Sequence, residues 1–467
     1  MNLTIEAPAG STNHGNPKLL CVPPKAIDYL IFYVANYFAQ AASVVIEPGQ
    51  SLPTIISCVF MALLMPGSGV ARALTVIVRC ANWQQKNDGQ RAARAGALCM
   101  VVKKTKNQSP ALEGLVGLPG EFGDLNISKG PNDPENEPQP RGTSQTENDE
   151  GNYEQGLKIP EGYSYMPVLS GTSIHGHRNL SKEFHREFYI GMVPAFANLQ
   201  LTPAENVGGS SGSQTPKPLI ASSISLVRPF MSLIQAVWGA ITLYRARGIQ
   251  VEEYGYAAFG LTVAPYVMMS VLNALGNILT PVYPCLFLIR TKLLEEVQRQ
   301  GIATFDGVVN AKFDTTETME SSICLRRPRG FIAAFDNSLI PPGDTISRHI
   351  IFTTSDLKFL GICLLFGLVP LAVTGSISGF QNGNSTALER GFTMSWLVMG
   401  LFHGLLMSLH VIRVTNAKNI EDVTFGRFII DSFLTPWLLF EFGVPAIGGM
   451  VMVGKMIKNF GICTLIS

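Results

Sequence analysis

The chain has 467 residues, of which 15% are charged and 46% hydrophobic, and its formal net charge is +1. Soluble domains carry roughly 25% charged residues, so this composition argues against a string of soluble domains. Nucleic-acid binders usually present a basic face or stripe, and no stretch here alternates Lys or Arg with aromatic residues. We therefore expect no nucleic-acid partner.

Seven segments are apolar and about 20 residues or more in length, which is what a bilayer-crossing helix needs. They are Ala26–Ile46, Pro53–Ile77, Ile220–Tyr244, Ala257–Leu279, Leu357–Phe380, Phe392–Ile412 and Phe428–Val453. The sequence therefore predicts an all-α, polytopic transmembrane helix bundle of about seven spans in the lipid bilayer. A long, partly disordered soluble insertion separates the second span from the third.

The polar segments divide the chain between these spans. Their expected order is a cytosolic tail (1–25), spans one and two (26–81), a soluble insertion (82–219), spans three and four (220–290), a soluble cap (291–356), and spans five to seven with a C-terminal tail (357–467). The tail has no apolar core of a cleavable signal peptide. Within the insertion, the acidic stretch 128–155 and the Gly/Ser-rich stretch 208–218 predict disorder.

The distribution of Lys and Arg near the expected spans predicts the orientation. Lys18 and Lys25 precede the first span, and further basic residues follow the even-numbered spans, so the rule that basic loops stay inside puts the amino terminus in the cytosol. The sequon at Asn384 then falls on the lumenal side, where glycosylation is expected. These features favour a multi-pass protein of the endoplasmic reticulum.

Eight cysteines occur without any C-x-x-C pair, and several lie in apolar runs where cysteine behaves as a small hydrophobic residue. We expect neither a disulfide framework nor a zinc site. His175, His177 and His185 have metal-compatible spacing but lack a second ligand cluster. No phosphate-binding loop, dinucleotide fingerprint or G-x-S-x-G elbow occurs, so no metal or cofactor is expected.

The first predicted span carries a polar face. Asp28, Asn36 and Gln40 recur at helical spacing, Glu47 continues this stripe, and Tyr33 and Tyr37 lie beside it. Such a face should point into the bundle, either to bind a substrate or to bond neighbouring helices. For Asp28 and Glu47, solvation at the helix ends is the alternative.

Two further spans carry ionisable groups, which are costly inside lipid and are functional candidates for that reason. Asp431 and Glu441 lie ten residues apart in the seventh span. His403 lies in the sixth span beside the Gly400-x-x-x-Gly404 motif, which predicts close helix packing. Pairing with a basic residue, for the acids, and a structural role, for His403, are the alternatives.

Four stretches carry a resemblance to a known group of proteins. NYFAQAASVVIEPGQS (36–51), MALLMPGSGVARAL (61–74), EEYGYAAFGLTVAPYVMMSVLN (252–273) and FEFGVPAIGGMVMVG (440–454) resemble fungal membrane-bound terpene cyclases of meroterpenoid pathways, of the ascofuranone cyclase type. The first motif often has His in that family where this chain has Gln40.

This resemblance implies an enzyme of fungal secondary metabolism that cyclises a lipophilic prenylated small molecule or its terminal epoxide. An acid protonates the substrate, aromatic faces stabilise the carbocation, and water is excluded until the ring closes. Glu441, Asp28, Asp431 and Glu47 are the candidate acids, and Tyr33, Tyr37, Asn36, Gln40 and His403 are candidate substrate-binding residues. A transporter or channel and a membrane signalling or scaffold protein remain the alternative classes.

Overall fold

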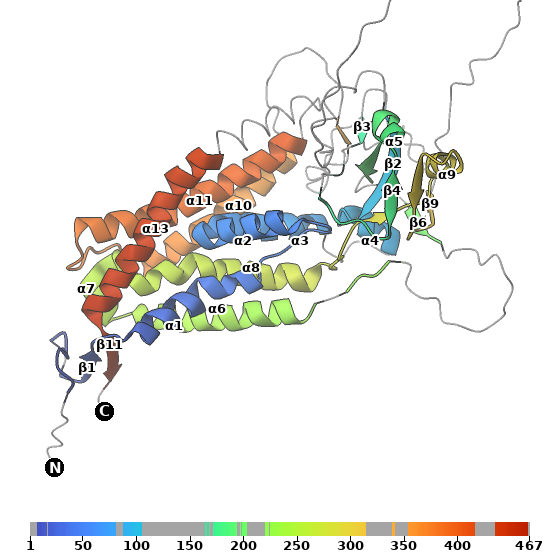
Figure 1. Ribbon diagram of the computed structural model, residues 1–467. Helices are drawn as coiled ribbons and strands as arrows, with labels where there is room; N and C mark the ends of the chain where they lie inside the picture. The colour runs from blue at the N-terminus through green and yellow to red at the C-terminus, as the bar shows by residue number, and fades with distance from the viewer. Residues whose placement is uncertain are drawn as a thin grey trace, which may run out of the picture.

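A computed structural model shows a bundle of long helices with a small α/β unit at one end (Figure 1). The structure describes residues 7–15, 17–80, 87–104, 164–165, 168, 171–193, 197, 199–202, 220–223, 225–313, 339–340, 354–415 and 435–465. The predicted disordered stretches 128–155 and 208–218 and the candidate Asp431 lie outside these residues.

The bundle is formed by helices that lie along its long axis (Figure 1). They are α1 (Ala26–Asn36) with the 3-10 helix η1 (Phe38–Ala42), α2 (Leu52–Leu64), α3 (Pro66–Cys80), α6 (Val227–Ala246), α8 (Ala264–Leu279), α10 (Thr354–Ser378), α11 (Ala387–Thr415) and α13 (Thr435–Phe460). Away from the α/β unit, α7 (Ile249–Tyr254) and the 3-10 helices η4 (Gly255–Ala257) and η5 (Phe259–Val263) connect α6 to α8. The bundle core is built mainly from apolar residues of α3, η5, α8 and α13.

Helices α2 and α3 form a hairpin rather than one long helix. Met65 leaves the helical conformation (φ −132°, ψ 81°), and Pro66 has no N–H to continue the helix. Arg72 Nη1 of α3 donates to Cys58 Sγ of α2 at 3.0 Å, so the two helices pack side by side. Trp396 Nε1, near the middle of α11, donates to Leu64 O at 2.9 Å. The turn of this hairpin therefore lies inside the bundle.

The α/β unit joins the two segments that the sequence separates into an insertion and a cap. Its central sheet has the order β5-β2-β7 and contains β2 (Leu98–Lys103), β5 (Phe188–Met192) and β7 (Phe287–Leu288). Smaller antiparallel pairs are β4 (Arg178–Leu180) with β8 (Ala303–Phe305), β6 (Leu199–Leu201) with β9 (Ala311–Phe313), and β3 (Ser164–Tyr165) with β10 (Leu339–Ile340). The helices α4 (Asp88–Arg94), α5 (Lys182–Glu187) and α9 (Lys292–Arg299) pack around these strands. The two segments thus fold as one unit.

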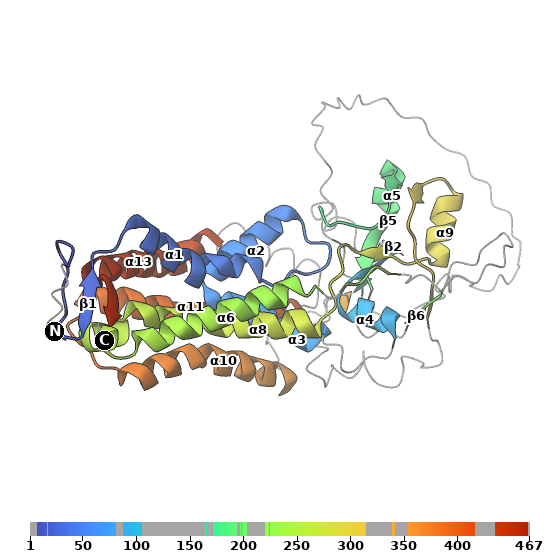
Figure 2. The ribbon, with the colours of Figure 1, turned by 90° about the horizontal axis from the view of Figure 1, so that it is seen from below.

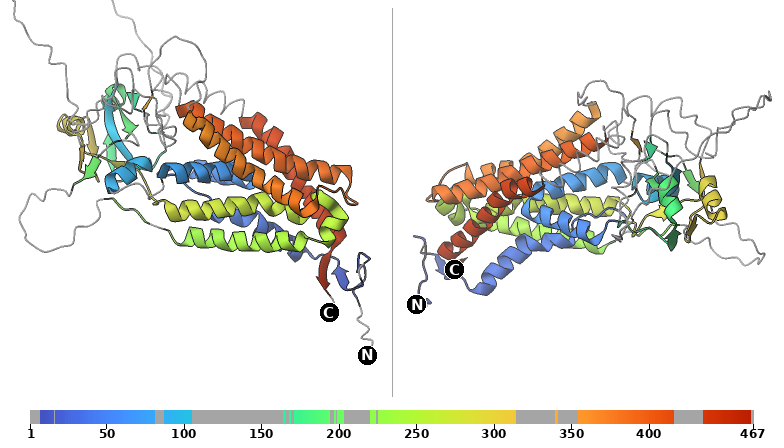
Figure 3. Two further views of the ribbon diagram at one scale, coloured as in Figure 1. Left: turned by 180° about the vertical axis from the view of Figure 1, so that it is seen from behind. Right: turned by 45° about the horizontal axis from the view of Figure 1, so that its top comes forward.

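A short β-ribbon closes the opposite end of the bundle. Strands β1 (Leu19–Val22) and β11 (Ile462–Leu465) pair antiparallel, and a disulfide joins Cys21 to Cys463 across them. We call this ribbon the terminal clasp; Figures 2 and 3 place it, with both termini, far from the α/β unit. The expectation that no cysteines form disulfides was wrong, because these two meet only after the termini have been brought together over 442 residues.

The expectation of an all-α bundle with about seven transmembrane spans is also wrong. Several β-sheets are present. In the described part of the chain, only two helical segments, Phe259–Leu279 and Leu357–Ser378, are long and apolar enough to cross a membrane. The physical reason is clearest at Pro53–Ile77, where the break at Pro66 leaves two helices that are each too short. Helix α1 is likewise only 11 residues long before the chain tightens into η1.

Candidate functional site

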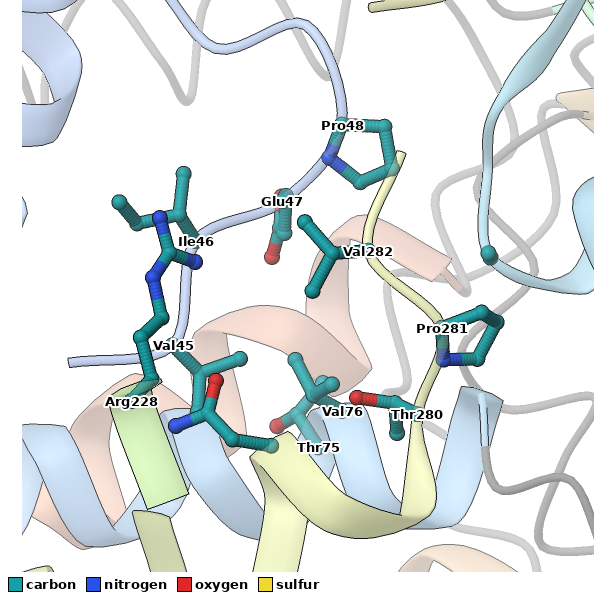
Figure 4. A pocket seen from close by; sticks show the side chains of 12 residues that line it. Val45, Ile46, Glu47, Pro48, Thr75, Val76, Arg228, Thr280, Pro281 and Val282 are labelled. Atoms are coloured by element: carbon teal, nitrogen blue, oxygen red, sulfur yellow. The ribbon is translucent and has the colours of Figure 1, made fainter. Parts of the chain in front are cut away.

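A pocket opens where the bundle meets the α/β unit (Figure 4). We call it the junction pocket. It is lined by Val45, Ile46, Glu47, Pro48, Thr75, Val76, Ala95, Arg228, Asn277, Thr280, Pro281 and Val282. Most of these side chains are apolar, and one acidic side chain, one basic side chain, two hydroxyls and an amide interrupt them. A mainly apolar wall with a few polar groups is the usual lining of a small-molecule site, but the cavity of about 30 Å³ has room only for a water-sized molecule in this structure.

Hydrogen bonds fix the segment that carries Glu47 against both parts of the molecule. Asn277 Nδ2 of α8 donates to Ser43 O at 3.1 Å. Further along, Ser173 N of the α/β unit donates to Gly49 O at 2.9 Å. Gly49 has φ +69°, and a Cβ there would lie 2.9 Å from Ser173 O, so only glycine fits. The segment therefore bridges the bundle and the α/β unit.

Arg72 of α3 organises the wall of the pocket around Glu47. Its Nε donates to Val45 O at 2.7 Å and its Nη2 to Gln50 Oε1 at 2.9 Å. The same Nη2 lies 3.9 Å from Glu47 Oε1, and Gln50 Nε2 donates to Glu47 Oε2 at 3.4 Å. Together with the bond to Cys58, all three nitrogens of the Arg72 guanidinium donate hydrogen bonds, so Arg72 holds this segment in a fixed position.

The two charged groups that line the pocket differ in their pairing. Glu47 has Arg72 as an ion-pair partner, and its side chain is 44% exposed. Arg228, at the start of α6, is half-buried, and among the described residues no acid lies within ion-pair distance of it. The pocket can therefore offer a carboxyl group and a guanidinium to the same ligand.

Asn36 and Gln40 point into the bundle, as the periodicity indicated, but they bond neighbouring helices and are buried away from the pocket. Thr242 Oγ1 of α6 donates to Asn36 Oδ1 at 2.9 Å. Ser270 Oγ of α8 donates to Gln40 Oε1 at 2.9 Å. These contacts match the helix–helix alternative for the polar stripe.

Tyr33 and Tyr37 belong to a closely packed aromatic cluster. Tyr37 is fully buried, with its ring centroid 4.9 Å from that of Tyr266 and 5.5 Å from that of Trp396. Its hydroxyl shares a 2.7 Å hydrogen bond with Thr262 Oγ1, and the Tyr33 hydroxyl donates to Met450 O. None of these rings lines the junction pocket. The cluster instead surrounds the α2–α3 turn, whose Leu63 O accepts from the Tyr266 hydroxyl.

The other candidate residues lie in different places. Asp28 accepts a hydrogen bond from Lys25 N at 2.7 Å and caps the start of α1, whereas Glu47 lies in the segment that follows η1. Glu441 lies on α13, in a part of the helix whose side chains are not described. His403 is buried on α11, where Gly400 and Gly404 allow close contact with Gly67 of α3. The packing role predicted for that glycine motif is confirmed.

The possible metal ligands do not gather at the predicted histidines. His175 stacks on Phe287 with 5.2 Å between ring centroids. Within the described residues, the one group of three close ligand-type side chains is His14, Cys21 and Cys463. The two sulfurs of that group are joined in the disulfide.

Sequence reasoning missed most of the pocket. Arg72, Arg228, Asn277 and Thr280 were not singled out, although an arginine at position 72 within an apolar run was a usable signal. No such signal exists for Thr280 or Asn277, because their role depends on neighbours from other helices.

Comparison of the chain with protein-family models, with curated proteins and with solved structures finds no match.

Proposed function

We propose that the protein is a membrane-embedded terpene cyclase that closes a ring in a linear prenylated precursor, or in its terminal epoxide, by acid-initiated carbocation chemistry. The observation that carries this proposal is the position of Glu47. Of the two candidate acids whose side chains the structure describes, Asp28 and Glu47, it is the one that lines a mainly apolar pocket. The stretch 36–51, which carries the resemblance to the cyclases, supplies Glu47 and three neighbouring lining residues.

In this proposal Glu47, in its neutral form, transfers its proton to the epoxide oxygen or the terminal double bond. Arg72 and Gln50 then stabilise the carboxylate that remains. Because Arg72 also anchors the backbone at Val45, the carboxylate keeps its position beside the cation, which is the arrangement that electrostatic catalysis requires.

The apolar outer surface of the bundle supports a membrane location. Leu365 on α10 is 62% exposed and Phe230 on α6 is 63% exposed, and exposed apolar surface on this scale marks contact with lipid or a partner. We propose a multi-pass protein of the endoplasmic reticulum, in which the bundle spans the bilayer and the two long apolar helices are among its crossings.

The test is product formation by microsomes that contain the full chain and are supplied with a prenylated phenol or its terminal epoxide. Glu47→Gln keeps the shape of the side chain and removes the acid, so turnover should fall by about 10²-fold with an unchanged protein level. Glu295→Gln is the matched control, because Glu295 also pairs with an arginine, Arg290, but lies on α9 of the α/β unit. Equal turnover in the Glu47→Gln variant and the unmodified protein would contradict the proposed role.

One observation favours the alternative of a transporter or channel. Hairpins whose turn lies inside a helix bundle occur in such proteins, and the α2–α3 turn has this placement. Here, however, its carbonyl groups at Leu63 and Leu64 are bonded by Tyr266 and Trp396, which leaves them unavailable to a permeating ion. If the protein moves ions or solutes across liposomes and cyclises no substrate offered, the transporter function replaces the cyclase.

A further inference from the structure

Four segments that are distant in sequence meet at the clasp end of the bundle. Asn384 N, in the turn between α10 and α11, donates to Glu253 O of α7 at 2.6 Å. The Tyr254 hydroxyl of α7 donates to Met456 O of α13. Next to them, the His14 ring stacks on Phe460 at the start of the clasp. The terminal clasp, α7 and the α10–α11 turn therefore share one end, opposite the α/β unit (Figure 1).

This end carries two chemical features of the secretory lumen. Disulfides persist in oxidising compartments, and the Cys21–Cys463 bond holds the clasp together. The sequon Asn384-Ser385-Thr386 has an exposed asparagine, and its Nδ2 makes only a long, exposed 3.3 Å hydrogen bond to Glu253. Glycosylation acceptors of this type are modified on surface loops in the lumen.

The opposite end holds reduced cysteines. Cys99 and Cys285 of the α/β unit are free thiols, as is Cys58 beside the junction pocket. Burial raises the pKa of the Cys99 thiol, and the neighbouring Cys285 raises it further although Arg178 opposes the change. Two nearby thiols that stay unpaired suit a reducing compartment.

The hairpin explains why this arrangement differs from the orientation predicted from charge. Because α3 returns to the end from which α2 started, the amino terminus lies on the same side as Asn384, whereas the prediction placed the two on opposite sides. Lys18 and Lys25 then share an end with Arg245 and Arg247. Arg290, Lys292 and Arg299 lie with the α/β unit at the opposite end, so the Lys/Arg bias no longer places the amino terminus in the cytosol.

We propose that the clasp end faces an oxidising lumen and carries an N-glycan on Asn384, and that the α/β unit and the junction pocket face the reducing cytosol. The inference rests on the proposed membrane location. It adds that a lipophilic substrate reaches Glu47 from the cytosolic side of the membrane. Any enzymes that supply this substrate would act on the same side.

The first experiment is expression of the full chain in a eukaryotic cell, followed by deglycosylation and gel electrophoresis of the membrane fraction. Because Asn2-Leu3-Thr4 is a second sequon at the amino terminus, the test uses an Asn2→Gln background. The protein in this background should shift, and the added Asn384→Gln should abolish the shift completely. Asn179→Gln is the matched control, since Asn179-Leu180-Ser181 is an exposed sequon on β4 of the α/β unit and should carry no glycan. Modification of Asn179 would overturn the proposal.

A second measurement does not depend on access of the glycosylation enzyme. Lys312→Cys on β9 and Asn382→Cys in the α10–α11 turn place a thiol at exposed sites of opposite ends. On sealed microsomes, a membrane-impermeant maleimide should label the first directly and the second only after detergent. The reverse pattern would overturn the orientation.

Extraction with alkaline carbonate separates the two possible failures. If carbonate releases the protein, the membrane location fails, and the proposed cyclase and this inference fail with it. If the protein stays in the membrane but the labelling is reversed, the orientation alone is wrong.

Discussion

The bundle and the α/β unit distribute polar and apolar side chains in opposite ways. The large apolar side chains that the structure exposes, from Ile27 to Ile462, all belong to the bundle, its connecting turns or the clasp. The buried polar side chains among the described residues, such as Asn36, Gln235 and Asn273, also lie in the bundle or at its ends. The α/β unit instead buries apolar side chains in two cores around β2 and exposes charged ones.

This difference indicates that the two regions are built for different surroundings. In the α/β unit, burial of apolar area stabilises the fold in water. In the bundle, the proposed lipid surroundings would remove that driving force between helices, and hydrogen bonds and close packing would hold them together instead. The contacts of Gln40 with Ser270 and of Gly67 with Gly400 are of this kind.

The largest expected effect comes from the same substitution made in both regions. Leu199→Ala, at a fully buried position between α4 and the sheet, should destabilise the α/β unit by about 2–5 kcal/mol. Leu365→Ala, on the outer face of α10, should change stability far less. Thermal unfolding of both variants in detergent measures the difference in stability. Similar losses of stability in the two variants would show that the two regions do not differ in what stabilises them.

A charge on the outer face of the bundle tests what surrounds it. Leu365→Lys should cost roughly 2.5–3.5 kcal/mol if the middle of α10 faces lipid and almost nothing if it faces water. Thr304→Lys, at an exposed position on β8 of the α/β unit, is the control and should be tolerated. The measurement is the fraction of each variant that stays in the membrane after carbonate extraction. If the Leu365→Lys protein resists extraction completely, the middle of α10 does not face lipid.

A smaller effect is expected at the turn inside the bundle. Trp396→Phe keeps the aromatic packing with Tyr37 but leaves Leu64 O without its donor, which should cost about 1–3 kcal/mol. Trp238→Phe is the matched control, because Trp238 is 42% exposed on α6. If chemical unfolding gives the same midpoint for both variants, the hydrogen bond to Leu64 does not stabilise the hairpin.

The smallest effect concerns pH and is confined to the α/β unit. Burial lowers the pKa of His185, and the positive charges of Lys104 and Arg178 lower it further. Below its ordinary pKa of about 6.5, the unfolded chain therefore binds the proton before the folded one does. Stability should fall as the pH drops from that value toward the lower pKa of the folded state.

His185→Gln should flatten this loss of stability with falling pH. Thermal unfolding between neutral and mildly acidic pH gives the slope for each protein. An unchanged slope in the variant would show that another group is responsible.

Local sequence predicted several elements well. The segments Ala257–Leu279 and Leu357–Phe380 correspond closely to the two helical segments that can cross a membrane, because length and apolar content are local properties. The inward direction of Asn36 and Gln40 also followed from helical spacing alone. The sequence could not decide whether these residues bind a substrate or a neighbouring helix, since both uses require the same pattern.

The sequence by itself determined where apolar helices form and that polar side chains face the bundle interior, since both depend on neighbours within a few turns. Only the tertiary structure decided that α2 folds back on α3, that Cys21 meets Cys463, and that Glu47, and not Asp28, lines the junction pocket. Each of these depends on contacts between segments far apart in the chain. The physical reason is that the composition of an apolar stretch is the same whether it crosses the bundle or turns back at a proline. The helices that pack against it decide which of the two occurs.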